Sequence, residues 1–110
     1  MLEDAGWDAS FGMPPQTFAD LVGSKYDLVS RLGKPIIIVE LGVSGIAERQ
    51  AAWLNQVPPA LAYFPRIRAI SYFDDVNAMN NRLPTQPDWR VAPEILARLI
   101  EQTSLVSWPR

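Results

Sequence analysis

The sequence contains no cysteine and no histidine among its 110 residues. Without cysteine, disulfide bonds and thiolate metal sites are excluded. Without histidine, the chain lacks the commonest general base and the commonest transition-metal ligand of proteins, and it cannot build a Ser-His-Asp triad. Any acid–base chemistry near neutral pH must therefore depend mainly on carboxylates, and we expect neither a metal nor a cofactor.

Two further absences limit the partners. No apolar run approaches the roughly 18 residues that span a bilayer, and the net charge is -2 with acids and bases interspersed. Nucleic acid and anionic membrane surfaces both require a basic patch, so we expect neither as a partner. The first residues, MLEDAGWDAS, lack the basic start and apolar centre of a signal peptide.

The length suffices for one small domain covering residues 1–110. Residues 1–15 are rich in glycine and proline, and we expect them to be irregular. A helix is predicted next, because Thr17 can cap it and apolar residues follow at helical spacing as far as Leu32. Gly33 suits the left-handed position that commonly follows a helix.

The stretch KPIIIVELGVSG predicts a strand that is apolar on both faces, from Ile36 to Glu40, followed by a loop over 41–46. Further along, the pattern predicts a proline-interrupted helix over 47–63, a second strand over 67–73, a loop over 74–92 and a helix over 93–103. This order of helices and strands indicates an α/β fold with parallel strands. Two such strands cannot complete a sheet, so we expect them to need neighbours.

Three segments resemble the C-terminal quarter of glycoside hydrolase family 26, the β-mannanases and related endo-glycanases. These segments are KPIIIVELGVSG, then ERQAAWLNQVPPALAYFPRIRAISYFD, then PDWRVAPEIL. The shared features are a Lys-Pro-led strand ending in Glu-x-Gly, an Ala-Trp helix, a Phe-Pro turn and Asp-Trp-Arg before the last helix. The resemblance covers about residues 11 to 102. It implies a partial TIM barrel, with the last two β/α units of a fold of about 250 residues.

By this resemblance, Glu40 corresponds to the catalytic nucleophile at the end of the seventh strand. Retaining glycosidases need a second carboxyl group about 5–5.5 Å away as acid/base. In this family it comes from the fourth strand, which the chain does not contain. The resemblance therefore implies a glycosidase fragment that acts on β-linked polysaccharide only with the rest of the barrel. From the residues alone, Glu40 could equally be a solvated strand end.

Aromatic side chains at a barrel mouth can bind the flat faces of sugars. The candidates for substrate binding are Tyr72, Phe73, Trp7 and Trp89. Each has a structural alternative, which is core packing for the first two and packing of irregular segments for Trp7 and Trp89. Trp53 lies at helical spacing with apolar neighbours and is expected in the core.

Asp74, Asp75 and Asn77 form an oxygen-rich run. The run lacks the glycine and terminal glutamate of an EF-hand loop, so a turn with self-bonding side chains is expected rather than a metal site.

Three functional hypotheses remain from the sequence. The first is the C-terminal part of a mannan-type β-glycanase, whose partner is a polysaccharide or oligosaccharide. The second is a non-catalytic carbohydrate-binding remnant. The third is a small α/β interaction domain that covers its sheet edges by self-association or with a partner. The choice between mannan, xylan and mixed-linkage glucan stays open, as does localisation, although secretion is usual for such families.

Overall fold

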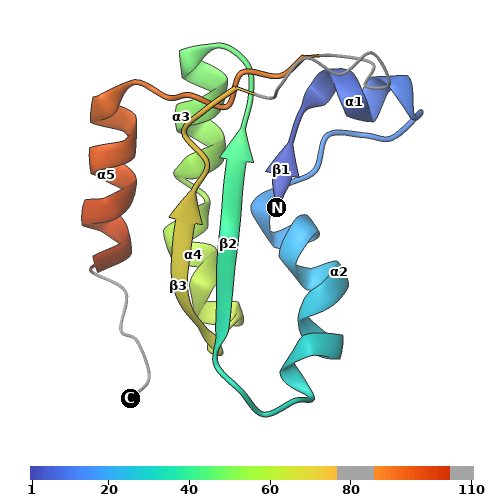
Figure 1. Cartoon of the computed structure of the whole chain (residues 1–110), viewed down its shortest axis with the longest axis vertical. Coiled ribbons are helices and arrows are strands. Elements are labelled where there is room, and N and C mark those ends of the chain that lie inside the picture. Colours follow the sequence, from blue (N-terminus) through green and yellow to red (C-terminus); the bar gives the residue numbers. More distant parts are fainter. Residues whose placement is uncertain (77–85, 105–110) are drawn as a thin grey trace.

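The computed structural model describes residues 1–76 and 86–104 and shows an α/β chain with three parallel strands in the order β1-β2-β3 (Figure 1). Its elements are β1 (Leu2–Glu3), α1 (Ala5–Ser10), α2 (Phe18–Ser30), β2 (Ile36–Val43), α3 (Ala47–Leu54), α4 (Val57–Ala60), the 3-10 turn η1 (Leu61–Tyr63), β3 (Ile67–Tyr72) and α5 (Pro93–Ser104). No helix in the described ranges is long and apolar enough to cross a membrane.

Helix α2 begins where the sequence predicts and ends at Ser30, two residues before the expected end at Leu32. The Thr17 hydroxyl accepts the Asp20 N–H at 3.1 Å, and the Asp20 carboxylate accepts the Thr17 N–H at 2.9 Å. This capping box satisfies two backbone donors at the start of the helix. At the other end Gly33 has φ of 66°, a conformation in which glycine avoids the strain of a side chain.

Strands β2 and β3 are adjacent and parallel, as the sequence predicts, and α3, α4 and η1 cross between them. The expectation of two strands and an irregular N-terminus was wrong. Residues 1–15 contain β1, which pairs with the end of β2, and α1, which is capped by Asp4. This pairing also extends β2 beyond the expected end at Glu40, because Gly42 and Val43 are the residues that face β1.

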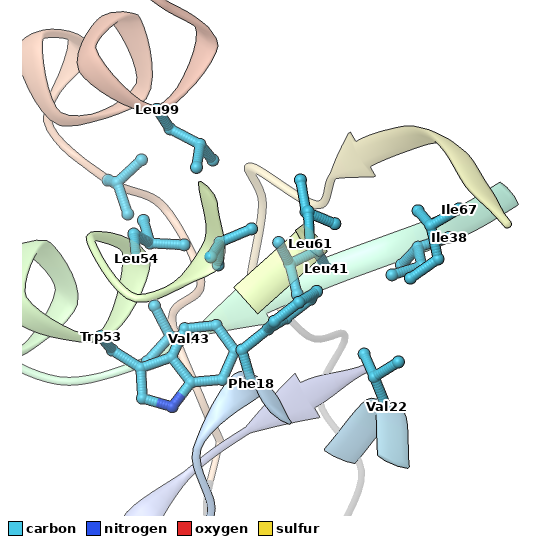
Figure 2. Close-up of a cluster of buried hydrophobic side chains, with 12 residues drawn as sticks. Phe18, Val22, Ile38, Leu41, Val43, Trp53, Leu54, Leu61, Ile67 and Leu99 are labelled. Carbon is cyan, nitrogen blue, oxygen red and sulfur yellow. The ribbon is translucent and has the colours of Figure 1, made fainter. Parts of the chain in front are cut away.

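The core lies on one face of the sheet (Figure 2). Strands β2 and β3 contribute Ile38, Leu41, Val43 and Ile67, and the covering helices contribute Phe18, Val22, Trp53, Leu54, Val57, Leu61 and Leu99. Trp53 is buried against Phe18, as expected, with ring centroids 6.2 Å apart. The opposite face is not covered by the described residues, because Ile37 and Val39 remain 61% and 73% exposed. We call it the open face.

A bulge interrupts β2 near its carboxyl end. Ile38 pairs with Ile70 and Leu41 pairs with Tyr72, so two residues of β2 oppose only Ser71 of β3. The inserted residue shifts the alternation of side chains by one position. Both residues between Ile38 and Leu41, Val39 and Glu40, therefore lie on the open face.

Candidate functional site

Glu40 is the sequence candidate for a nucleophile, and the bulge places it on the open face. Its neighbour Leu41 is fully buried in the core, whereas Glu40 is exposed. Among the described residues, none donates a hydrogen bond to the Glu40 carboxylate. Its charge lies near enough to the Met1 amino group to raise the pKa of that group against the effect of burial. The exposed carboxylate can also meet a ligand that approaches the open face.

Gly42 lies two residues beyond Glu40, on the same face, beneath Trp89. A Cβ at this position would come within 2.9 Å of Leu2 Cδ2 and 3.3 Å of Trp89 Cε3, so only glycine lets these side chains approach so closely. Trp89 is fully buried and meets Trp7 edge to face, with ring centroids 5.5 Å apart and planes at 72°. The structure thus brings two predicted sugar-binding aromatics together, but Trp89 has no exposed surface for a sugar.

Tyr72 and Phe73 come at the end of β3. The Tyr72 hydroxyl donates to the Trp89 carbonyl at 2.7 Å and accepts the Val43 N–H at 3.3 Å. Burial raises the pKa of the Tyr72 hydroxyl, which therefore stays protonated at neutral pH. Tyr72 connects the ends of two strands to the segment that carries Trp89. Phe73 is half-buried, and its N–H donates to Leu41 O at 2.7 Å.

Gln50 provides a second link between the same segments. Its side-chain amide donates to Val43 O at 3.0 Å and to Arg90 O at 2.9 Å, and the residue is 5% exposed. The end of β2 is therefore fastened to residues 89–90 from two sides. The sequence analysis did not single out Gln50, because its partners lie in distant parts of the chain.

The acidic run after β3 has a structural role. Asp75 accepts the Val76 N–H at 2.8 Å, a local bond of the kind that the turn alternative expected. Asp74 instead accepts the N–H of the distant Val91 at 3.0 Å. Asn77 lies outside the described residues. No group of three or more acidic side chains in the described ranges could hold a metal ion.

Asp88 and Arg90 form a bidentate pair near the carboxyl end of the sheet. Arg90 Nη2 lies 2.7 Å from Asp88 Oδ2, and Arg90 Nε lies 2.9 Å from Asp88 Oδ1. The Arg90 side chain lowers the pKa of Asp88 by hydrogen bonding to its charged form. The pair borders an open cleft of about 460 Å³, which Asp4, Gly6, Ser44 and Gly45 also line.

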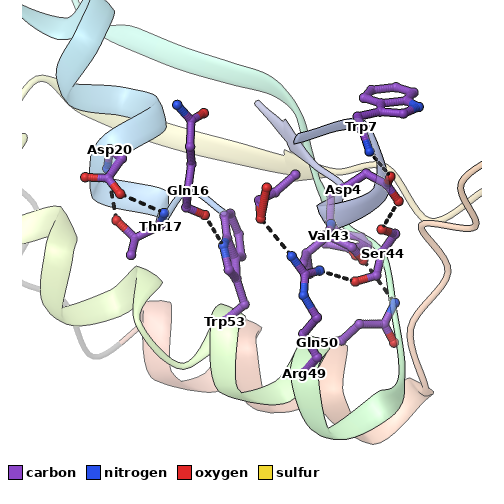
Figure 3. Close-up of polar contacts among 12 residues, drawn as sticks. Asp4, Trp7, Gln16, Thr17, Asp20, Val43, Ser44, Arg49, Gln50 and Trp53 are labelled. Atoms are coloured by element: carbon purple, nitrogen blue, oxygen red, sulfur yellow. Dashed lines mark hydrogen bonds and ion pairs between the residues drawn. The ribbon is translucent and has the colours of Figure 1, made fainter. Parts of the chain in front are cut away.

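A buried polar network beside this cleft was missed by the sequence analysis (Figure 3). Glu3 is 2% exposed and accepts from Arg49 Nη2 at 2.8 Å. Arg49 also donates to the Ser44 carbonyl, and the Ser44 hydroxyl donates to Asp4. The network joins β1 and the start of α3 to the loop after β2. The acidic start LEDAGWD was its only sequence signal.

Asp8 adds a second buried carboxyl group to this network. Its Oδ2 atom has no hydrogen-bond donor among the described residues. Burial, together with the neighbouring Asp8 carboxyl, raises the pKa of Glu3 to about 7 against the opposing effect of Arg49. A protonated Glu3 can donate to Asp8, whereas two carboxylates can only accept.

No protein-family model matches the chain. No curated protein matches it either.

Proposed function

We propose that this chain is the C-terminal part of a retaining glycoside hydrolase of the family-26 type, with Glu40 as its nucleophile. The proposal combines the resemblance of the three sequence segments with the α/β arrangement of parallel strands. The partial TIM barrel belongs to this proposal. In a barrel, β2 and β3 would be the seventh and eighth strands, and the open face would line the interior.

One observation carries the proposal, namely the bulge that turns Glu40 onto the open face. In a regular strand, Glu40 would share the covered face with Ile38, because side chains alternate with a period of two. Bulges are frequent beside active sites, where they redirect a side chain. A barrel active site lies at the carboxyl ends of the strands. The open face, and the position of Glu40 one residue before the last pair of β2 with β3, therefore suit a catalytic carboxylate.

The chemistry follows from this position. A carboxylate oxygen of Glu40 attacks the anomeric carbon of a β-linked sugar, and the glycosidic oxygen leaves with a proton from an acid/base. Water then hydrolyses the glycosyl ester. The acid/base comes from a strand outside this chain, so the 110 residues alone should not turn over polysaccharide. Mannan-type polymers are the proposed substrate class.

The aromatic candidates divide into two groups under this proposal. Phe73 is only half-buried at the end of β3, and Trp7 is half-buried in α1, so both retain surface for a sugar. Tyr72 and Trp89 instead hold the carboxyl ends of β2 and β3, because Trp89 is fully buried and the Tyr72 hydroxyl is bonded to backbone. Their part in substrate binding would be indirect.

A second candidate function is a small α/β interaction domain. The exposed side chains of Ile37 and Val39 favour it, because adjacent β-branched residues on a sheet face are normally covered. This alternative needs no chemistry at Glu40.

A hybrid barrel tests the choice. Residues 1–110 would replace the matching C-terminal portion of an active family-26 mannanase, and β-mannan hydrolysis would be measured. We expect a folded, active hybrid in which Glu40→Ala loses more than 99% of the rate. The matched control Glu48→Ala, at an exposed position of α3, should keep the rate. Azide should partly restore cleavage of an activated aryl mannoside and yield the inverted glycosyl azide.

A hybrid that fails to fold, or folds without activity, would refute the proposal. So would a Glu40→Ala hybrid that keeps more than about a tenth of the rate, since that corresponds to only ~1.4 kcal/mol in the barrier.

A further inference from the structure

The turns at the amino end of the sheet carry exposed cations. Arg31 directly follows α2, Lys34 lies in the turn before β2, and Arg66 directly precedes β3. The Ile36 N–H donates to Arg66 O at 2.7 Å, and the Arg66 N–H donates to the Tyr26 hydroxyl at 2.9 Å, so the two turns are joined to each other and to α2. These charges are dispersed in the sequence, and only the fold gathers them where β2 and β3 begin (Figure 1).

No acid forms an ion pair with these cations in the described ranges. Both ion pairs of the described residues lie at the carboxyl end of the sheet. Arg68 of β3 adds a fourth exposed cation, while Asp27 and Glu101 are the acids in the last turns of α2 and α5. The helix dipole explains a cation at Arg31, near the end of α2, but not the cations in the turns before β2 and β3. The amino end therefore keeps an excess of positive charge exposed to water.

Two large apolar side chains lie on the same turns. Leu32 is 72% exposed beside Arg31, and Tyr63 of η1 is 80% exposed shortly before β3 begins. The next residue, Phe64, packs on Tyr26 with ring centroids 5.0 Å apart, which fixes this turn against α2. Apolar side chains flanked by lysine and arginine are the combination with which proteins lie on anionic bilayers. Tyrosine suits the boundary because its ring is apolar and its hydroxyl is polar.

The opposite end of the sheet carries exposed acids. Glu48 and Glu94 lie in the first turns of α3 and α5, which begin at that end (Figure 1). Asp74 and Asp75 follow β3 there. A negatively charged surface would attract the amino end and repel the carboxyl end, so the net charge of -2 still permits binding in one orientation.

We propose that the amino end of the sheet binds the headgroup region of an anionic lipid bilayer. The contacting residues, which we call the amino-end surface, are Arg31, Leu32, Lys34, Tyr63 and Arg66. The cations contact lipid phosphates and carboxylates, while the two apolar side chains enter the boundary with the acyl chains. A soluble polyanion would use the cations alone and leave the apolar side chains in water. The proposal departs from the expectation of no membrane partner, which rested on the absence of a basic patch from the sequence.

The test is cosedimentation of the 110-residue chain with vesicles of phosphatidylcholine and phosphatidylserine, compared with vesicles of phosphatidylcholine alone. We expect binding to the anionic vesicles only, and weaker binding as the salt concentration rises. Each cation close to an anionic leaflet contributes about fivefold to binding. Lys34→Glu and Arg66→Glu, in two separate turns, should each weaken binding about tenfold or more. The matched control Arg98→Glu, at an exposed position in the middle of α5, should change binding less than about twofold.

Two further variants test the apolar contact. Leu32→Ser should weaken binding to anionic vesicles about fivefold or more, because the bound state loses a buried leucine. It should leave binding to soluble polyphosphate unchanged. Val39→Ser, on the open face, should leave vesicle binding unchanged. All of these positions are exposed, so circular dichroism should show the same helix content in every variant.

Four results would overturn the proposal. The first is equal binding to both kinds of vesicle, or binding to neither. The second is an effect of Arg98→Glu as large as that of Lys34→Glu, which would indicate attraction without a defined surface. The third is full vesicle binding by Leu32→Ser, which would assign the cations to a soluble polyanion such as a nucleic acid. The fourth is loss of binding in Val39→Ser, which would assign the contact to the open face. None of these results involves Glu40, so the catalytic proposal is tested separately by the hybrid enzyme.

Discussion

The buried carboxyl group of Glu3 should make the fold less stable as the pH rises toward neutrality. The pKa of Glu3 is 4.5 in its ordinary state and about 7 in the folded chain, chiefly because of burial. The folded state therefore binds this proton more tightly than the unfolded state. The stabilisation is complete below about pH 4.5 and is lost progressively until the pH passes about 7.

The magnitude follows from these two pKa values. Each tenfold change in proton affinity is worth about 1.36 kcal/mol, so the difference corresponds to at most about 3 kcal/mol. Water that reaches the charged carboxylate and relaxation of the folded chain around it reduce the cost of burying the charge, and so reduce this figure. We expect a measured loss of about 1–2 kcal/mol between pH 4.5 and pH 8.

The assay is urea unfolding at one low protein concentration across this pH range. Glu3→Gln should remove the slope, because an amide can donate to Asp8 at every pH. Glu48→Gln, an exposed acid on α3, serves as the matched control and should keep the slope. The lowered pKa values of Asp20 and Asp88 act below their ordinary value of 3.8, outside this window. The lowered pKa of the Met1 amino group acts below its ordinary value of 8.0 and makes stability rise with pH, a slope of opposite sign that Glu3→Gln leaves in place. A Glu3→Gln chain that keeps the full slope would refute the assignment.

Three other changes test the packing. Gly42→Ala should lower the free energy of unfolding by about 1–3 kcal/mol, because the added methyl group would press on Leu2 and Trp89. A change below about 0.5 kcal/mol in urea unfolding would contradict this close contact. Tyr72→Phe should cost a similar ~1–3 kcal/mol by leaving the Trp89 carbonyl without its donor, and an unchanged thermal midpoint would contradict this. The chain should associate through its open face, so sedimentation should detect oligomers, and Val39→Lys should convert them to monomers. A monomer at every protein concentration would contradict association through the open face.

The sequence predicted the regular elements with strong local patterns. Helix α2 was predictable from Thr17 and its apolar spacing, and the parallel strands from their apolar runs bounded by turn residues. The core position of Trp53 followed from the same periodicity. These features depend on residues close together in the chain, which a single sequence displays directly.

The rest depends on contacts between distant segments. Strand β1 has only two residues, too few for any periodicity, and it forms because Gly42 and Val43 offer it an edge. The bulge at Val39 and Glu40 is set by the register with β3 and leaves no local signal. The ion pair of Glu3 with Arg49 joins residues 46 positions apart. The sequence therefore identified Glu40 as the candidate nucleophile, but it did not predict the bulge that orients the Glu40 side chain.

The most direct test of the central proposal is to trap the nucleophile in the hybrid mannanase. A 2-deoxy-2-fluoro-β-mannosyl fluoride would be added, in which attack at the anomeric carbon forms a glycosyl ester as fluoride leaves with the bonding electrons. The fluorine at C2 slows hydrolysis of this ester, so the intermediate accumulates for peptide mass spectrometry. The proposal predicts one sugar on the peptide that contains Glu40 and none in the Glu40→Gln form. A label on another residue, or an active hybrid with no label, would contradict it.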